Sequence, residues 1–394
     1  MKTQLTTNLF SQLICSNCGD IFSGFLLNTI STCCNKPLLA NYHLDQYLPK
    51  ELIKVNDHSM WRYFSLLPIA DKQNIVSLKE GGTPIISLDK LAANNDITSV
   101  LMKDEAFNPT GSFKARGISA AVSKAKELGI DRLIIPTAGN AGGALAAYCA
   151  KANMQCIVVM PEHTPTIFKN ECRLLGAELI LVKGLIDSCA KKVQEIQQSK
   201  NYFDVSTLKE PYRLEGKKTM GYEIAEQLDW ALPDVIVYPA GGGTGLIGIW
   251  KALQEMLKLG WIKGPLPKMI AVQSENCAPL AMAAHHRSNW KENFLARPTI
   301  ANGLAVPFPF GMELMLNVIE SSGGQVITVS EQEIIEAIKD VSRTEGVLLC
   351  PEGAAAWKAI ELLAKYKKIS SENKVLFLNT ASGHKYLESI KNYL

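Results

Sequence analysis

The sequence lacks the features that would assign it to several specialised classes of protein. Neither sign of charge prevails, because basic and acidic residues alternate along 394 residues and leave a formal net charge of +3. So small a charge predicts no basic surface for nucleic acid or for an anionic membrane. No apolar run reaches the roughly 18 residues of a membrane span, and the first ten residues do not resemble a signal peptide. We therefore expect a cytoplasmic protein with no nucleic-acid or membrane partner.

No complete fingerprint of nucleotide binding is present. No glycine-rich segment ends in Gly-Lys-Ser/Thr, and the one that reads Gly-x-Gly-x-x-Gly, residues 243–248, has no acid about 20 residues after it to bind a ribose. A disulfide framework is not indicated either, because six of the ten cysteines stand singly in apolar surroundings. Single cysteines in apolar surroundings usually serve as small core residues with free thiols, as in proteins of a reducing compartment. With 47% hydrophobic and 20% charged residues, the composition is that of a globular protein.

The other four cysteines gather near the N-terminus. They are Cys15, Cys18, Cys33 and Cys34. A Cys-x-x-Cys turn followed about 15 residues later by a second pair of cysteines is typical of structural zinc sites. The second pair is imperfect, since Ser31 stands where a cysteine would fall if Cys34 is the last ligand, and His43 is a further candidate ligand. Two interpretations stay open, a zinc-binding knuckle and a degenerate knuckle without metal.

After residue 60, apolar strands alternate with helical patterns. The predicted strands are Ser99–Lys103, Leu133–Thr137, Cys156–Met160, Glu178–Val182, Val235–Tyr238, Met269–Gln273, Gln325–Val329 and Val375–Asn379. The predicted helices are Gly117–Leu128, Gly143–Ala152, Asp187–Gln198, Gly216–Leu228, Leu246–Leu259, Glu331–Thr344 and Ala354–Tyr366. This alternation predicts an α/β fold of mostly parallel sheets covered by helices, with ligands at the carboxyl ends of strands. The length predicts about two domains.

One segment, Pro109–Gly117 with the sequence PTGSFKARG, is the most informative. Turn-forming residues precede Lys114 and present it at the start of an alanine-rich helix. A lysine that forms an imine with an aldehyde cofactor needs a rigid and shielded setting, because only the neutral amine attacks a carbonyl. The alternative is a solvated lysine in the first turn of a surface helix.

Three glycine-bearing segments could bind the remainder of a cofactor or substrate. In Pro136–Gly143, small residues would let a flat ring lie against the backbone, and Asn140 could hydrogen-bond a ring hydroxyl. Successive amides in Pro239–Gly245 precede a helix and suit an anion. Two glycines and the hydroxyl of Thr83 stand in Leu78–Pro84. For each segment the alternative is an ordinary turn or a closely packed junction.

In their order along the chain these segments resemble those of threonine synthases, in the large family of pyridoxal-phosphate (PLP) enzymes that includes serine/threonine dehydratases and cysteine synthases. The resemblance covers residues from about 60 to the end and, more loosely, the knuckle. It implies the tryptophan-synthase-β fold, called fold type II, and a homodimer. It also implies an N-terminal knuckle and linking segment in residues 1–60 and a catalytic body in 61–394. Within that body, a smaller mobile subdomain of about 100–220 would be inserted in a larger cofactor-anchoring domain.

The resemblance assigns roles to individual residues. Lys114 would be the catalytic residue and the Schiff-base lysine. The other cofactor-binding residues would be Asn140, Gly241, Gly242, Gly243, Thr244 and Thr380, with the hydroxyl of Thr380 on the pyridine nitrogen. The substrate-binding residues would be Thr83, Ser112, Ala138, Gly139, Ser206 and Arg213. The arginine lies in an Arg-Leu-Glu-Gly segment and could hold two oxygens of a phosphate.

The reaction that the resemblance implies is the conversion of O-phospho-L-homoserine and water to L-threonine and phosphate. Ala115 replaces the aspartate usual after the lysine, and Ala138 replaces a serine. These departures leave open a serine/threonine dehydratase or a β-replacement enzyme such as a cysteate synthase. A cofactor-binding protein without turnover is a second alternative. Glu352 is either an active-site acid or an acid favoured at a helix N-terminus, and His384 is a minor candidate for a base.

Overall fold

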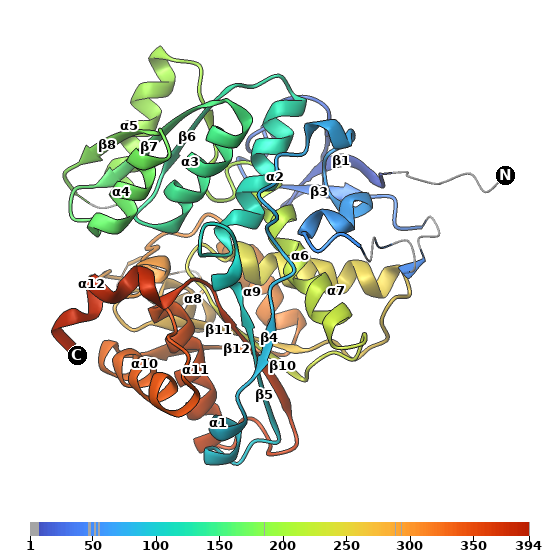
Figure 1. Cartoon of the computed structure of the whole chain (residues 1–394). Coiled ribbons are helices and arrows are strands. Elements are labelled where there is room, and N and C mark those ends of the chain that lie inside the picture. Colours follow the sequence, from blue (N-terminus) through green and yellow to red (C-terminus); the bar gives the residue numbers. More distant parts are fainter. Residues whose placement is uncertain are drawn as a thin grey trace. The chain divides into compact units, whose positions relative to one another are not determined.

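The computed structural model describes residues 8–45, 49–50, 53, 56–184, 186–287, 289–292 and 294–393 (Figure 1). Part of the predicted segment 1–60 therefore lies outside the described residues. The chain divides into two compact units. Unit 1 comprises residues 1–82, 114–220 and 251–262, and unit 2 comprises residues 83–113, 221–250 and 263–394. The predicted domain boundaries and the mobility of a smaller subdomain stay predictions.

Unit 1 begins with a small antiparallel sheet. Its strands, in the order β2-β1-β3, are β1 (Phe10–Cys15), β2 (Ile21–Ser23) and β3 (Leu38–Tyr42). The ring of Phe10 packs against those of Phe25 and Tyr42, with centroids 6.0 and 5.8 Å apart. These three strands were not predicted, because they are short and carry polar residues among their apolar ones.

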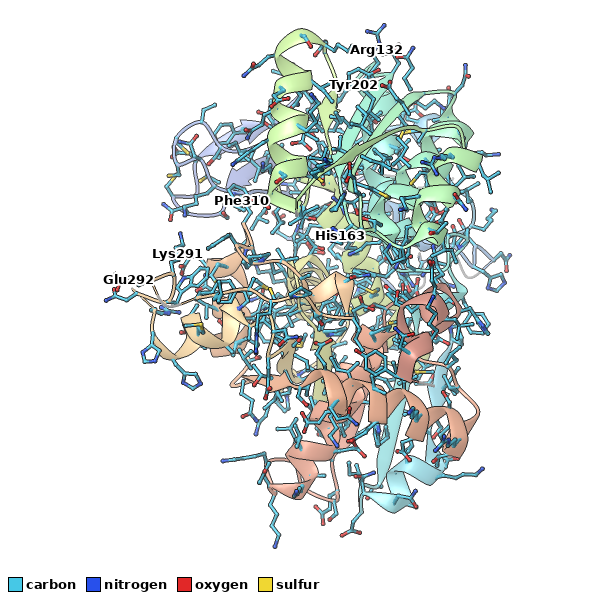
Figure 2. All side chains as sticks on the ribbon, turned by 90° about the vertical axis from the view of Figure 1, so that its left-hand side faces the viewer. Arg132, His163, Tyr202, Lys291, Glu292 and Phe310 are labelled. Atoms are coloured by element: carbon cyan, nitrogen blue, oxygen red, sulfur yellow. The ribbon has the colours of Figure 1, made fainter. Side chains whose placement is uncertain are left out.

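A second sheet of unit 1 is wholly parallel, in the order β8-β7-β6-β9. Its strands are β6 (Arg132–Pro136), β7 (Gln155–Pro161), β8 (Glu178–Val182) and β9 (Phe203–Asp204). The connecting helices are α3 (Asn140–Ala152), α4 (Thr166–Leu174) and α5 (Ile186–Ser199). Figure 2 shows Arg132 and Tyr202, at the amino ends of strands, far from His163, which follows the carboxyl end of β7. The loops at the carboxyl ends of these strands carry predicted cofactor- and substrate-binding residues.

The first turns of two helices approach each other so closely in unit 1 that only glycine fits between them. They are α2 (Lys114–Glu127) and α6 (Tyr212–Gln227). A Cβ on Gly216 would lie 2.1 Å from the carbonyl oxygen of Arg116, and one on Gly117 would lie 2.7 Å from that of Arg213. The close approach fixes the first turn of α2 beside the first turn of α6.

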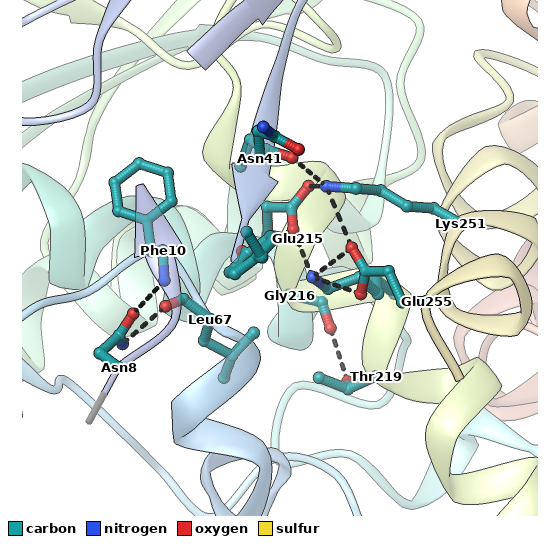
Figure 3. A network of polar contacts seen from close by, with 12 residues as sticks. Asn8, Phe10, Asn41, Leu67, Glu215, Gly216, Thr219, Lys251 and Glu255 are labelled. Atoms are coloured by element: carbon teal, nitrogen blue, oxygen red, sulfur yellow. Dashed lines mark hydrogen bonds and ion pairs between the residues drawn. The ribbon is translucent and has the colours of Figure 1, made fainter. Parts of the chain in front are cut away.

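A buried ion-pair network joins α6 to the small sheet (Figure 3). Lys218 Nζ lies 2.7 Å from Glu215 and 3.0 Å from Glu255, and Lys251 also pairs with Glu215. The Tyr42 hydroxyl of β3 donates to Glu215 at 2.7 Å. Burial alone would raise the pKa of Glu215, but the two lysines hold it below its ordinary value. Breaking a buried pair of this kind is strongly destabilising, because the remaining charge is left without a partner.

Unit 2 is built on a six-stranded sheet in the order β12-β11-β10-β13-β5-β4, in which only β4 runs antiparallel. The strands are β4 (Ile85–Ser87), β5 (Ser99–Asp104), β10 (Val235–Pro239), β11 (Lys268–Ser274), β12 (Gln325–Val329) and β13 (Lys374–Asn379). The main core packs this sheet against α1 (Asp89–Asn94), α10 (Glu331–Glu345) and α11 (Pro351–Lys365). Helices α8 (Pro279–His285) and α9 (Met312–Ser321) contact β12, and α9 also contacts β11. Helix α7 (Thr244–Lys258), like α6, contributes residues to both units.

The predicted α/β class is confirmed, and each predicted strand and helix is present with ends within four residues of those expected. The main corrections concern helix starts. Helices α2, α3 and α6 begin at Lys114, Asn140 and Tyr212, not at the glycines where the prediction placed them. Glycine has a low helix propensity, so glycine in or beside the first turn hid the true start of each helix from the prediction. Among the helices that the structure describes, none combines the length and apolar character needed to cross a bilayer.

Candidate active site

In unit 2, the loop between β10 and α7 has the form of an anion cradle. A Cβ on Gly241 would lie 2.0 Å from the carbonyl oxygen of Gly303, and Gly243 has a φ of +76°, so both positions require glycine. The N–H groups of Gly241, Gly242 and Gly243 have no hydrogen-bond partner among the described residues. Thr244 then begins α7. Unpaired amides at a helix N-terminus are suited to a phosphate group.

Glu352, at the start of α11, supports this cradle from behind. Its Oε1 accepts the N–H of Gly303 at 2.7 Å, and the Tyr386 hydroxyl lies 3.3 Å from the same oxygen. The residue is 4% exposed, and its Oε2 has no partner within the described part of the chain. Because the carbonyl of Gly303 lies against Gly241, Glu352 fixes one wall of the loop.

The residues just before Lys114 are fixed against the end of β13. The N–H of Phe113 donates to the carbonyl oxygen of Thr380 at 3.0 Å, and Ser112 forms a β-bridge with Ala381. Ser112 is fully buried, yet its hydroxyl has no partner among the residues described. Most buried hydroxyls are hydrogen-bonded, so this one suits a bound ligand. Thr380, the predicted partner of a pyridine nitrogen, is itself buried.

Thr83 belongs to a buried polar network that the sequence did not indicate. Its hydroxyl donates to Glu105 at 2.7 Å, and Asn108 donates to the same carboxylate at 2.8 Å. The Lys103 ammonium donates to the carbonyl of Thr83 at 2.6 Å and to Glu223 at 2.8 Å. The only sequence signal of this network was the charged residues Lys103 and Glu105, at and just after the end of an apolar strand. Thr83 as a substrate contact stays a prediction.

In unit 1, two helix N-termini carry predicted site residues. Lys114 begins α2, and Asn140 begins α3 and is buried. Ala138 and Gly139 form the turn from β6 into α3, where the Gly139 N–H donates to the hydroxyl of Thr137 at 3.2 Å. Glycine and small residues mark the turn from β6 into α3 in the sequence, and the roles of all four residues stay predictions.

Arg213 and Ser206 lie close together in unit 1. The Arg213 Nη1 donates to the carbonyl of Val205, the neighbour of Ser206, at 2.5 Å. Arg213 is 2% exposed, and its Nε has no partner in the described ranges. The hydroxyl of Ser206 donates to Asp204 at 2.5 Å. An orphaned N–H on a buried guanidinium is costly unless a ligand accepts it.

Lys217 is a buried lysine at this place that sequence reasoning missed, although it follows the Arg-Leu-Glu-Gly segment directly. Its Cε lies 3.0 Å from where a Cβ on Gly117 would stand, so its side chain ends at the first turn of α2. Burial, and then the charges of Lys114 and Arg213, hold the pKa of Lys217 well below its ordinary value. The carboxylate of Glu210 is the acid that opposes this shift. An anion bound beside Lys217 would favour its charged form and raise this pKa.

The N-terminal cysteines come together as the zinc interpretation requires. Their four sulfur atoms all lie within 4.8 Å of one another. Ser31 Oγ lies 3.3 Å from Cys15 Sγ, beside the cluster, and His43 is exposed and does not belong to it.

Comparison with known proteins assigns the family. Residues 76–381 match the family described as pyridoxal-phosphate dependent enzymes. The chain belongs to this family. Proteins named threonine synthase from Methanocaldococcus jannaschii and Methanosarcina acetivorans are 32% and 33% identical to it, over 94% of this chain and 92% and 91% of theirs. The chain is therefore a PLP-dependent lyase, as the resemblance predicted.

Solved structures of the same fold include maize serine racemase, with a TM-score of 0.66 and 20% identity over 79% of this chain and 92% of that one. Threonine deaminase isoform 2 from Solanum lycopersicum has a TM-score of 0.64 and 22% identity over 78% of this chain and 82% of that one. These likenesses confirm the predicted fold type II. The residues present also fit PLP, because the amides of Gly241, Gly242 and Gly243 offer an anion cradle that side chains would fill.

We expect Glu352→Ala to weaken the affinity of the PLP-dependent enzyme for PLP by about 5- to 100-fold, the equivalent of one lost buried hydrogen bond. The reason is that the Gly303 N–H loses its acceptor and the wall of the cradle loosens. Equilibrium binding of PLP measures this effect. Glu352→Gln keeps an acceptor oxygen and should bind PLP nearly as well as the wild type. Equal losses in both variants would contradict a positioning role.

We expect anion binding in unit 1 to weaken as the pH rises through about 7. Burial raises the pKa of Glu210 to about 7, against the opposing effect of Arg213 and Lys217. Because this pKa is raised, the neutral carboxyl is favoured at lower pH, and its ionisation above pH 7 cancels one neighbouring cation. Sulfate keeps its charge over this range, so its dissociation constant, measured from thermal stabilisation, should rise about tenfold between about pH 6 and 8. In Glu210→Gln the rise should be clearly smaller, and an unchanged rise would contradict the assignment.

Proposed function

We propose that this lyase is a threonine synthase, which converts O-phospho-L-homoserine and water to L-threonine and phosphate. The observation that carries the proposal is the buried Arg213, whose Nε is orphaned and whose charge acts on the buried amine of Lys217 beside it. A phosphorylated amino acid would neutralise this charge, whereas serine or threonine offers no group to do so. The relatives named threonine synthase support the proposal.

Bound PLP supplies an electron sink that stabilises negative charge on the α and β carbons of the substrate. In unit 2, residues Gly241 to Thr244 would hold its phosphate and the Thr380 hydroxyl its pyridine nitrogen. In unit 1, Asn140 would hydrogen-bond its ring hydroxyl and Lys114 would bind its aldehyde carbon. A hydroxyl partner, unlike a carboxylate, need not keep the pyridine nitrogen protonated.

Lys114 would move the protons of the reaction. Its neutral Nζ accepts the α proton, and a β proton is then lost. The bond between Cγ and the phosphate oxygen breaks, and phosphate leaves with its electron pair. The hydroxyl of water adds at Cβ and its remaining proton goes to the released phosphate. The two protons taken from Cα and Cβ are replaced by protons delivered to Cα and Cγ, which completes L-threonine. Arg213, Lys217 and Ser206 would hold the phosphate of the substrate and orient it for departure.

A substrate panel tests the proposal. We expect kcat/KM for O-phospho-L-homoserine to exceed that for L-serine or L-threonine by at least about 10²-fold, because a site built to pair with a charged group discriminates strongly against substrates that lack it. Faster release of ammonia from L-serine or L-threonine would establish a dehydratase instead. Incorporation of sulfite with phosphate release from O-phospho-L-serine would establish a β-replacement enzyme. We also propose a homodimer, which light scattering during size-exclusion chromatography tests.

A further inference from the structure

Two short turns bring the four N-terminal cysteines together. The first turn follows β1 and is closed by the Gly19 N–H, which donates to the Cys15 carbonyl at 3.0 Å. The second precedes β3 and is closed by the Asn35 N–H, which donates to the Ser31 carbonyl at 2.9 Å. A hydrogen bond from the Ser16 N–H to the Pro37 carbonyl at 3.0 Å joins the two turns. Each turn therefore presents two thiols from a fixed backbone.

The spacing of the sulfur atoms matches a tetrahedral metal site. With Zn–S bonds of about 2.3 Å, two sulfurs of a tetrahedral site lie about 3.8 Å apart. The Sγ atoms of Cys18 and Cys33 lie 3.4 Å apart, and all four sulfurs lie within 4.8 Å of one another. A disulfide bond is about 2.05 Å long, so Cys18 and Cys33 are too far apart to be bonded. Adjacent Cys33 and Cys34 both reach the cluster, which resolves the imperfect spacing of the sequence motif.

Polar groups beside the cluster are placed to support bound thiolates. Ser31 Oγ lies 3.3 Å from Cys15 Sγ, and the Lys36 N–H donates to Ser31 Oγ at 3.0 Å, which orients the hydroxyl. The side-chain amide of Asn17 donates to Cys34 Sγ at 3.4 Å. Such groups around the ligands commonly set the affinity of a metal site. Ser31 is therefore a supporting group rather than the missing ligand.

We propose that Cys15, Cys18, Cys33 and Cys34 bind one zinc ion as a closed structural site. Four thiolates leave no open position for a substrate or a water molecule, so the ion does not take part in catalysis. Zinc would join the end of β1 to the turn that leads into β3. Through Tyr42 and Glu215, β3 is in turn fixed to α6, the helix that carries Arg213. The zinc site would thus stabilise the unit 1 elements that hold the proposed substrate residues.

Metal analysis of the full-length protein, purified under reducing conditions without chelator, tests the proposal. We expect one zinc per chain by mass spectrometry. After exchange with Co²⁺, we expect the thiolate-to-cobalt charge-transfer and d–d absorption bands of a tetrahedral thiolate site. The proposal would be overturned if the thiols of the four cluster cysteines stayed reactive in the presence of micromolar zinc and the protein bound no cobalt. A disulfide bond between Cys18 and Cys33 would also overturn it. Since no substrate is used, failure here is distinct from failure of the proposed function.

Variants show whether these particular residues bind the ion. Cys18→Ser and Cys33→Ser should each lower zinc affinity at least about 100-fold, and Ser31→Ala should lower it about 10- to 100-fold. Cys156→Ser, outside the cluster, should keep wild-type affinity. If a variant fails to fold, the same question is answered by removing zinc from the wild-type protein with a chelator. Removal of zinc should then lower the thermal midpoint of unfolding, and readdition should restore it. Full zinc content in Cys18→Ser and Cys33→Ser would contradict the assignment.

Discussion

Replacing Lys114 with alanine is expected to lower kcat/KM for O-phospho-L-homoserine by about 10⁴-fold or more, since one group is removed from both covalent and proton-transfer steps. The variant should also lose the absorption of the imine that wild-type enzyme forms with PLP. Steady-state kinetics and the visible spectrum measure the two effects. The loss follows from the position of Lys114, which begins α2 directly after a segment hydrogen-bonded to Thr380.

Lys126→Ala provides the matched control, because Lys126 lies on the same helix and is exposed. It should keep near wild-type turnover and spectrum. Thermal unfolding of both variants shows whether either substitution has disturbed the fold. If Lys114→Ala kept normal activity with bound PLP, then the assignment of Lys114 as the catalytic lysine would be wrong.

Replacing Arg213 with methionine is expected to lower kcat/KM for O-phospho-L-homoserine by about 10²- to 10³-fold, the range for truncating a buried charge partner. The substrate phosphate would lose its charged partner, while the apolar methionine avoids leaving a new buried charge at position 213. Arg213→Lys should recover part of the loss, since it restores charge but not the planar donor pair. Kinetics with saturating PLP separate this effect from cofactor binding.

Two controls decide whether Arg213 acts on the phosphate. Arg173→Gln removes an exposed arginine on α4 and should leave kcat/KM unchanged. Any slow deamination of L-serine should be nearly unaffected by Arg213→Met, because serine carries no phosphate. Equal losses for both substrates would assign Arg213 to the stability of unit 1 and weaken the proposed function.

The sequence predicted eight of the ten strands in the six-stranded and four-stranded sheets, because these eight are nearly continuous apolar runs, and missed the short strands β4 and β9. The bounds of β8 and β12 match the prediction residue for residue. The antiparallel strands β1 and β2 escaped because their stability comes from pairing and from the packing of Phe10, which local composition does not show. Tertiary context commonly overrides local preference in short strands of this kind.

The sequence predicted the individual loops of the candidate site but not the tertiary contacts that surround and support them. Glycine-rich turns marked the loops around Asn140 and Gly242, since few other residues permit such turns. Arg213 and Lys217 are four residues apart on α6 and so share one of its faces, but the contact of Lys217 with the first turn of α2 could not be predicted in the same way. It depends on the close approach of Gly117 and Gly216, which brings together helices about 100 residues apart in the sequence. Likewise, the support that Glu352 gives to the cradle depends on a tertiary hydrogen bond.

The most direct test of the proposed function is the fate of oxygen from water. The enzyme is supplied with O-phospho-L-homoserine in water enriched in oxygen-18, and the products are analysed by mass spectrometry. We expect equal amounts of phosphate and L-threonine, with one labelled oxygen on the β carbon of threonine and none in newly released phosphate. Label in the phosphate, with homoserine as the other product, would show simple hydrolysis of the ester. That result, or the absence of phosphate release by the PLP-loaded enzyme, would contradict the proposed function.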